Sequence, residues 1–401
     1  IEAWAHVQVF SPWRFNVDPA ARTLLLGAGW TEPDADVLPT GAELLAVYLE
    51  PLAKLPQLAD RIRLGAQVIG VGRVGFDKMK TPGREQAPFE VRTRTATGDE
   101  TLLARAVIDA SGTYATPNPL GAGGLSAIGE AEQRDRIFYG IPDVLGAHRL
   151  RYAGRSVVVV GSGHSAFNVL LDLARLREAA PATTITWAIR RDEIGTLYGG
   201  GGADALPARG GLGDRVRALE EARVIRLATS FRTHSVSRRA GGVTLRAADG
   251  RELGPFDEII GATGFRPELG MLSELRLDLD PAVESPRALA PLIDPNIHSC
   301  GTVPPHGVEE LAHPEPGFYI VGMKSYGRAP TFLMLTGYEQ VRSVVAELTG
   351  DHAAARRVEL ILPATGVCST DASAGACGGA AAAACCGEQP STVIVPFGRK
   401  A

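Results

Sequence analysis

The sequence is poor in features that mark several large classes of protein. It has only five cysteines in 401 residues, too few and too unevenly placed for a secreted disulfide scaffold. It lacks the long apolar run of a transmembrane helix and, at its start, the basic and apolar regions of a signal peptide. The net charge is only −4, without a long basic stretch, so neither nucleic acid nor an acidic membrane is an expected partner. We therefore expect a cytoplasmic protein with a small-molecule partner.

What is present predicts an α/β protein. The length and the 45% hydrophobic content suffice for two globular domains. Apolar residues at helical spacing predict an amphipathic surface helix over residues 41–55. Strand-like stretches at 62–74, 88–96 and 104–112 predict a sheet meander that ends in one buried strand. From Arg155 to Pro267, strands and helices alternate as in a parallel doubly wound sheet, and further helices are expected at 212–223 and from 330 or 331 to 348.

A glycine turn in the middle of the chain predicts a dinucleotide site. The four valines 157–160 suit a strand that is covered on both faces. Gly161 allows a tight turn, Gly163 lets the backbone approach a pyrophosphate, and Ala166 is small where helix and strand pack. The helix that follows would hold the phosphates at its N-terminus. The predicted contacts are Gly161, Ser162, Gly163, His164, Ser165 and Ala166. A glycine turn that serves packing alone is the alternative.

Two arginines follow the next strand of this unit. Arg190 and Arg191 stand where an NAD site usually offers an acid to the ribose 2′-hydroxyl. Guanidinium groups suit a 2′-phosphate, so the pair favours NADPH. Asp192 and Glu193 keep NAD open, and a solvated charged turn is the simpler alternative.

Two further stretches carry a family resemblance. Residues 106–119 (AVIDASGTYATPNP) and 256–269 (FDEIIGATGFRPEL) share an apolar run, then Ala-Ser/Thr-Gly, then an aromatic residue and a proline. Both resemble the Ala-Thr-Gly segments of flavoproteins that bind two dinucleotides. With the central glycine turn and PGFYIVGMKSYG at 316–327, the chain resembles flavin-containing monooxygenases and thioredoxin-reductase-like oxidoreductases, close to the flavoprotein monooxygenases associated with arsenic resistance. The resemblance runs from Trp4 to Gly350.

The resemblance implies a two-dinucleotide-binding-domain α/β fold. A Rossmann-like NADPH domain at 151–267 would be inserted in an FAD domain formed by 1–150 and 268–363, with an Ala/Gly/Cys-rich flexible tail at 364–401. The family's first glycine turn, which holds the FAD pyrophosphate, would lie upstream of Trp4. We therefore expect an N-terminally truncated FAD domain that lacks about 35 to 45 residues, the usual length of a strand, helix and strand. Such a chain would bind FAD poorly or not at all.

The same resemblance assigns cofactor contacts. The second Ala-Thr-Gly segment adds Ala262, Thr263 and Gly264 to the nucleotide contacts. Predicted FAD contacts are Ser111, Gly112, Thr113, Gly322 and Met323, with Ser11, Pro12 and Trp13 as weaker predictions. Met323 replaces the aspartate that binds the ribityl chain in many relatives, which puts that hydrogen bond in doubt.

The flavin would carry the redox chemistry, so an acid–base triad is not required. Lys324 and Arg328 are candidates to stabilise charge on the reduced flavin, although a solvated basic turn explains them equally well. The NADPH domain has no Cys-x-x-Cys pair, which argues against disulfide reduction by that route. His298, Cys300, His306 and His313 form a candidate metal or thiol site, but their spacing matches no zinc pattern, and ordinary loop packing is the favoured alternative.

Four cysteines gather near the end of the chain. Cys385 and Cys386 are adjacent, and Cys368 and Cys377 could approach them through the flexible Ala/Gly segment. Clustered thiolates suit thiophilic ions, and the arrangement resembles the vicinal cysteines at the end of mercuric reductases. A disordered extension with incidental cysteines is the alternative.

The expected function is that of an NADPH-dependent, monooxygenase-like flavoprotein oxidoreductase. Hydride would pass from NADPH to FAD and then to oxygen or another acceptor, with a role in arsenic or thiophilic-metal detoxification. Two alternatives stay open: an NADPH-driven reductase that acts through the candidate catalytic thiols Cys385 and Cys386, and a nucleotide-binding or metal-sensing protein without turnover. A homodimer is compatible with either.

Overall fold

A computed structural model gives the fold of the chain and describes residues 1–192, 198, 207–297, 303–330 and 332–360. The helices are α1 (Pro19–Gly27), α2 (Gly41–Glu43), α3 (Glu50–Ala53), α4 (Arg149–Tyr152), α5 (His164–Ala179), α6 (Pro207–Glu221), α7 (Ala290–Ile293), α8 (Met334–Leu348) and α9 (His352–Arg356). The strands are β1 (Gln67–Arg73), β2 (Phe89–Thr95), β3 (Gly98–Ala104), β4 (Val107–Asp109), β5 (Ile137–Tyr139), β6 (Ser156–Val160), β7 (Thr184–Ala188), β8 (Ile225–Ala228), β9 (Thr233–Arg239), β10 (Gly242–Ala247), β11 (Glu252–Phe256), β12 (Glu258–Gly261) and β13 (Phe318–Ile320).

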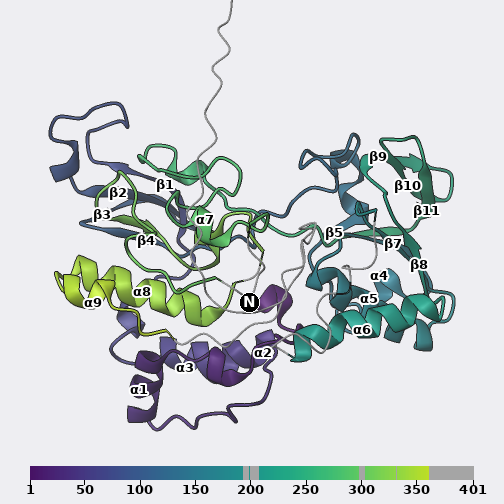
Figure 1. Cartoon of the computed structure of the whole chain (residues 1–401), viewed down its shortest axis with the longest axis horizontal. Coiled ribbons are helices and arrows are strands. Elements are labelled where there is room, and N and C mark those ends of the chain that lie inside the picture. The colour runs from purple at the N-terminus through teal and green to yellow at the C-terminus, as the bar shows by residue number, and fades with distance from the viewer. Residues whose placement is uncertain (193–197, 199–206, 298–302, 331, 361–401) are drawn as a thin grey trace, which may run out of the picture. The chain divides into compact units, whose positions relative to one another are not determined.

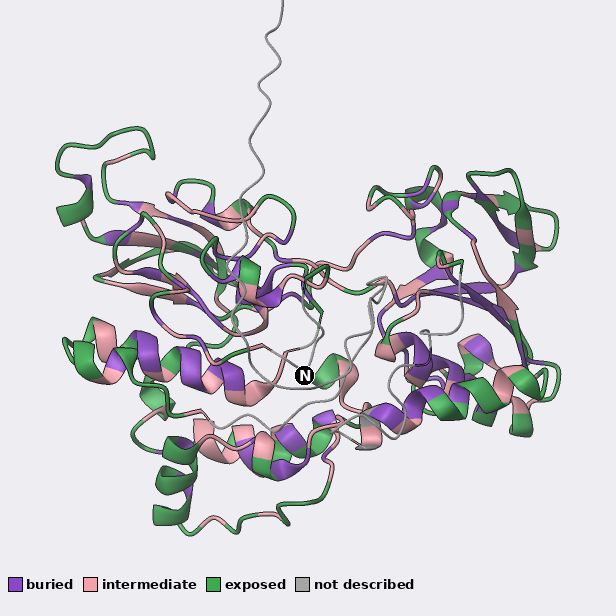
Figure 2. Ribbon diagram, viewed as in Figure 1, coloured by how far each residue is buried: buried purple, intermediate pink, exposed green. Residues whose placement is uncertain are grey.

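The middle of the chain forms a parallel five-stranded sheet in the order β5-β12-β6-β7-β8. α5 and α6 cover one face of this sheet, and the antiparallel sheet β9–β11 covers the other (Figure 1). Val157 and Val159 pack toward α5 and α6, whereas Val158 and Val160 pack toward β9–β11. A run of apolar residues is therefore needed, because both faces of β6 are covered. Figure 2 shows buried residues concentrated in the strands of this sheet.

The five-stranded sheet confirms the parallel sheet expected for the central segment, but the doubly wound arrangement is wrong, because helices cover one face and the antiparallel sheet β9–β11 covers the other. The sheet also takes in β5, which lies upstream of the predicted boundary at residue 151. In sequence, the whole unit lies between β4 and β13, and these two strands pair with each other in parallel. The chain thus leaves one sheet, builds a second one and returns to the first.

The sheet meander differs from its prediction in two respects. The sequence patterns do not predict β3, which follows β2 across a tight turn, and the meander is β1-β2-β3. The stretch at 104–112 does not end this meander. Its strand β4 pairs instead with β13, with Val107 opposite Phe318 and Asp109 opposite Ile320. The partner of β4 lies more than 200 positions away, which is why local sequence patterns did not reveal the pairing.

The predicted helix at 41–55 forms as α2, a π-helical stretch Leu44–Leu49 and α3 in succession. Thr40 and Glu43 form a reciprocal capping box at its start. Leu44 and Tyr48 are each only 2% exposed and pack with Trp13 and Leu25 in a separate apolar cluster. The helix therefore covers its own small core.

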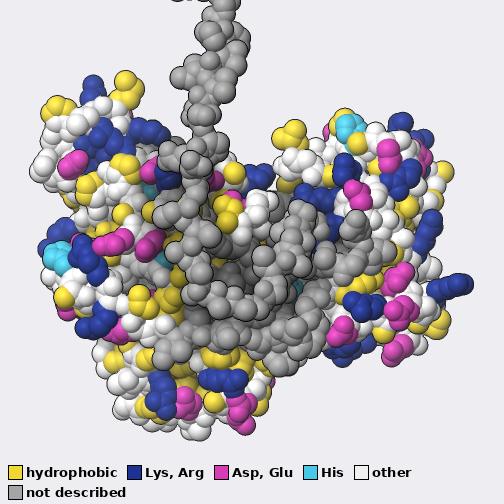
Figure 3. Space-filling view, in the orientation of Figure 1, with side chains coloured by type: hydrophobic (Ala, Val, Ile, Leu, Met, Phe, Trp, Pro, Cys, Tyr) yellow, Lys and Arg dark blue, Asp and Glu magenta, His cyan; other side chains and the backbone are white. Residues whose placement is uncertain are grey.

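The expected helices at 212–223 and 330–348 are present as α6 and α8, with shifted ends. No helix among the described residues is long and apolar enough to span a membrane. On the face drawn in Figure 3, the positive and negative side chains of the described residues are interspersed.

Candidate functional site

The glycine turn after β6 is built on a close approach of two strand ends. Gly161 has φ +132°, and a Cβ atom at this position would lie 2.1 Å from the carbonyl oxygen of Ala262. Ala262 follows β12, the neighbour of β6, and its N–H donates to Val160. A side chain at position 161 would therefore separate the two strands. The structure thus brings together the predicted turn and the predicted segment Ala262–Gly264.

Among the described residues, no side chain caps the N-terminus of α5. Gly163 is its N-cap residue, is exposed, and provides no side-chain cap to the first amides of the helix. A Cβ atom at Gly163 would meet nothing within 4 Å. Uncapped N–H groups and the positive end of the helix dipole favour a phosphate at this point. Ala166 is fully buried against the sheet, as its predicted packing role requires.

The remaining predicted residues of the turn lie around this helix start. Ser162, His164 and Ser165 are half-buried. The ring of His164 lies 5.6 Å from that of Phe10, measured between centroids. The N-terminal segment of the chain therefore reaches the beginning of α5.

Arg190 and Arg191 follow β7 at the carboxyl edge of the sheet, the edge that also carries Gly161. Arg190 is exposed and donates a hydrogen bond of 3.3 Å to the carbonyl of Ala122. Asp192 forms an exposed ion pair of 3.5 Å with Arg232. Glu193 lies outside the described residues. Asp192 thus has a partner other than the arginine pair.

A second site is framed by β4 and β13. Ser111–Thr113 follow β4, and Gly322 and Met323 follow β13, so the parallel pairing places the two predicted FAD segments at one sheet edge. Gly112 and Gly322 have φ values of +70° and +68°, and a Cβ atom at either would meet nothing within 4 Å. Both glycines thus have free space beside their Cα atoms, and their positive φ values would strain any other residue.

Lys324 ties these two segments together. Its ammonium group lies 2.7 Å from Oδ2 of Asp109 and 3.1 Å from the hydroxyl of Ser111. The Lys324 side chain is fully buried and that of Asp109 is 5% exposed. The alternative of a solvated basic turn is therefore wrong for Lys324, because its charge is neutralised inside the protein by Asp109. Sequence reasoning missed Asp109, although an acid within an apolar run was a usable signal.

Arg328, the other cationic candidate for catalysis, lies on the surface. Its guanidinium group pairs with Glu284 at 2.8 Å. Trp13, a weaker cofactor candidate, is buried in the N-terminal apolar cluster, and Ser11 donates to the side chain of Asn16 at 2.8 Å. Arg328, Trp13 and Ser11 thus each have partners within the protein, and their roles at a cofactor stay predictions.

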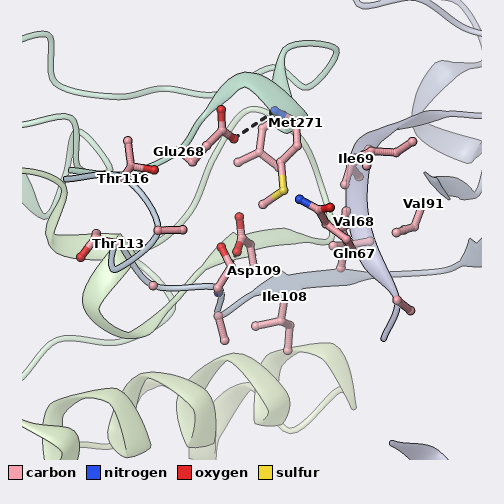
Figure 4. A pocket seen from close by; sticks show the side chains of 18 residues that line it. Gln67, Val68, Ile69, Val91, Ile108, Asp109, Thr113, Thr116, Glu268 and Met271 are labelled. Atoms are coloured by element: carbon pink, nitrogen blue, oxygen red, sulfur yellow. Dashed lines mark hydrogen bonds between the residues drawn. The ribbon is translucent and has the colours of Figure 1, made fainter. Parts of the chain in front are cut away.

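A cavity of about 630 Å³ opens beside Ser111–Thr113. Its walls are mainly apolar and come from β1, β2, β4 and the turn around Met271. Figure 4 shows Gln67, Asp109 and Met271 directed into the same space. Volume and lining match those of sites for small organic ligands.

The histidines of the candidate metal site have other partners. His306 contacts Gln340 and the carbonyl of Pro304, whereas His313 accepts a bond from the amide of Asp278. Burial lowers the pKa of His313 to about 4, so this side chain is neutral at pH 7. His298 and Cys300 lie outside the described residues, and no metal-ligating group of three occurs among the described ones. The tail cysteines Cys368, Cys377, Cys385 and Cys386 also lie outside the described part of the chain.

Comparison with known proteins identifies the fold. No protein-family model matches the chain, and no curated protein matches it significantly. The bacillithiol disulfide reductase Bdr (YpdA) from Staphylococcus aureus is a structural match with a TM-score of 0.57 and 16% identity, covering 86% of this chain and 84% of its own. DfoA, the FAD-bound cadaverine monooxygenase of desferrioxamine biosynthesis from Erwinia amylovora, matches with a TM-score of 0.57 and 14% identity, covering 92% and 90%. The chain therefore shares its fold with a disulfide reductase and an FAD-bound monooxygenase, which confirms the predicted two-dinucleotide-binding-domain flavoprotein fold.

Proposed function

We propose that this protein is an NADPH-dependent flavoprotein oxidoreductase with two nucleotide sites. The observation that carries the proposal is that no described side chain caps the start of α5. This helix start follows Gly161, where the close approach of Ala262 leaves no room for a side chain. This arrangement suits a pyrophosphate better than a turn that serves packing alone, because Gly163 is exposed and has open space beside it. NADPH is the proposed ligand here, with Arg190 and Arg191 beside its 2′-phosphate.

FAD is the proposed ligand of the edge formed by β4 and β13. The backbones of Gly112 and Gly322 are accessible there, and the adjoining apolar cavity could take an aromatic part of the cofactor. A bound flavin would supply the hydride and electron chemistry. The protein's own part is to position the two cofactors and to exclude water. Lys324 contributes by holding the ends of β4 and β13 together through Asp109 and Ser111.

The acceptor of the electrons is proposed to be oxygen, as in monooxygenases, with arsenic or another thiophilic species as the detoxified substrate. The arsenic role depends on the family resemblance and on the tail cysteines. The two structural matches represent both chemistries under consideration, since one is a monooxygenase and the other a disulfide reductase. Reduction through Cys385 and Cys386 is therefore the second candidate function.

The proposal predicts reduction of a bound flavin by NADPH. Protein that is expressed from its natural start codon and loaded with FAD is expected to lose its yellow colour when NADPH is added without oxygen, because the nicotinamide passes its hydride to the flavin. Anaerobic stopped-flow absorbance is the measurement. Turnover that survives replacement of Cys385 and Cys386 by serine favours the monooxygenase, and its loss favours the thiol reductase. A flavin that stays oxidised would contradict both and would favour a protein without turnover.

The arginine pair predicts coenzyme preference. Replacing Arg190 and Arg191 by alanine is expected to lower the ratio of kcat/KM for NADPH to that for NADH by at least about 100-fold, since each of the two charged hydrogen bonds to the phosphate contributes about 1.5–3 kcal/mol. Initial rates with the two coenzymes give this ratio. Arg175→Ala is the matched control, because Arg175 is an exposed arginine within α5. An unchanged ratio in the double variant would reject the assignment of the 2′-phosphate.

A further inference from the structure

Gly322, the first residue of the turn after β13, is held by a closed ring of hydrogen bonds. Its N–H donates to Oε1 of Gln340 at 2.7 Å, and its carbonyl accepts from the hydroxyl of Ser325 at 2.8 Å. Nε2 of Gln340 donates in turn to the oxygen of Ser325 at 2.9 Å. Both polar backbone groups of one residue are thus fixed by two side chains. Gln340 and Ser325 are both 0% exposed.

His306 completes this arrangement. Its Nε2 lies 2.9 Å from Nε2 of Gln340, and its Nδ1 lies 3.0 Å from the carbonyl oxygen of Pro304. The ring of His306 also packs against that of Tyr326, with 5.6 Å between centroids. The histidine is 3% exposed, so its contacts are made within the protein.

Only one assignment of donors and acceptors satisfies all these contacts. The carbonyl of Pro304 accepts, so Nδ1 of His306 carries the proton and donates to it. The amide nitrogen of Gln340 only donates, so Nε2 of His306 accepts. Burial lowers the pKa of His306, which agrees with a neutral ring. If the amide of Gln340 were flipped, its NH2 group would face the N–H of Gly322, and two donors would oppose each other. The orientation of this amide is therefore fixed as well.

Packing alone does not explain a glutamine at this buried position, because burying its amide group costs free energy. Gln340 projects from α8 into a region rich in apolar residues, among them Val321, Tyr326 and Val344. An apolar side chain would avoid that cost, but it would leave the N–H of Gly322 without its acceptor. What the glutamine adds is control of one peptide residue, Gly322, whose left-handed backbone faces open space on its Cα side.

We propose that Gln340 and His306 are positioning residues of the FAD site, which hold the peptide of Gly322 in the one orientation that presents its open Cα face to the cofactor. The inference rests on the proposed function, because it takes Gly322 to border the flavin nucleotide. Gln340 acts directly on Gly322, and His306 acts through Gln340.

The test compares Gln340→Met with Gln133→Met. Gln133 is a second buried glutamine, 8% exposed, whose side chain accepts a hydrogen bond from Arg238 at 3.1 Å. We expect Gln340→Met to weaken FAD binding at least about 10-fold, the equivalent of about 1.4 kcal/mol, and to change the visible circular dichroism of the bound flavin. Gln133→Met should leave both readouts unchanged even if its melting temperature falls. Flavin fluorescence titration gives the dissociation constant.

His306→Phe is the second variant, in case Gln340→Met does not fold. Phenylalanine keeps the ring packing on Tyr326 but removes the acceptor for Gln340, so a smaller change of the same kind in FAD affinity and circular dichroism is expected. If both variants bind FAD with the affinity and the circular dichroism spectrum of the wild type, this inference alone is overturned. Wild-type protein that is expressed from its natural start codon and binds no FAD would instead overturn the proposed function, and this inference with it.

Discussion

Replacing Glu315 by glutamine is expected to lower the free energy of unfolding by about 3–5 kcal/mol, the usual cost of breaking a buried ion pair from one side. The side chain of Glu315 is fully buried, and its carboxylate lies 2.8 Å from Nε of Arg73 and 2.5 Å from Nη1 of Arg84. It also accepts from the amide of Arg276 at 3.0 Å. Loss of its charge would leave two guanidinium groups buried without a counter-ion. Urea denaturation followed by circular dichroism measures the change.

The matched control is Glu100→Gln. Glu100 also pairs with an arginine, Arg63, at 2.6 Å, but the two side chains are 41% and 49% exposed. Exposed pairs contribute only about 0–1 kcal/mol, so this variant should be nearly as stable as the wild type. Equal losses in the two variants would show that the buried position of Glu315 has no special weight.

Acid should remove the same contribution. Burial alone would raise the pKa of Glu315, but hydrogen bonds from Arg84, the amide of Arg276 and Arg73 outweigh it and hold the pKa below its ordinary value of 4.5. A carboxyl group with a lowered pKa stabilises the fold fully above the unfolded-state pKa, and this stability is lost as the pH falls through the folded-state pKa. The difference between wild type and Glu315→Gln should therefore be constant above about pH 5 and shrink in stronger acid.

Some of these features were predictable because they are local. The valine run 157–160 needed cover on both faces, and the glycines that follow needed a tight turn, so strand, turn and helix could be predicted from twenty residues. The paired Ala-Ser/Thr-Gly segments added the nested order of the two units. The structure agrees on both points, since the five-stranded sheet lies between β4 and β13 in the sequence.

Other features depend on contacts between distant residues and left little local signal. β3 begins with Gly98, Asp99 and Glu100 and is largely exposed, so its composition resembles that of a turn. Glu315 meets Arg73 and Arg84 across more than 230 positions of sequence. The sequence around Lys324 is typical of a basic surface turn, yet its partner Asp109 lies at the end of a strand 215 positions earlier. Isolated charged residues do not reveal such partners.

The second large effect concerns Gly163. Gly163→Asp is expected to weaken NADP⁺ binding roughly 100-fold or more, because a carboxylate would occupy and repel the phosphate position at the start of α5. The same change should leave the fold intact or stabilise it by a few tenths of a kcal/mol to about 1 kcal/mol, since aspartate is a favourable N-cap residue beside the helix dipole. The backbone there, with φ −91° and ψ 179°, suits any residue.

Gly161→Ala is the contrasting variant in the same turn. Its new Cβ atom would overlap the carbonyl oxygen of Ala262, and its φ of +132° is strained for alanine. We expect both stability and nucleotide binding to fall in this case. Only the variant at position 163 separates the binding of the dinucleotide from the integrity of the fold.

The most direct measurement is therefore a calorimetric titration of NADP⁺ into wild-type protein and Gly163→Asp, with thermal melts of both. A dinucleotide site at the start of α5 predicts saturable binding to the wild type, little or no binding to the variant, and a melting temperature for the variant at least as high as that of the wild type. Equal affinity in the two proteins would contradict the account, because the phosphate could then not lie at this helix.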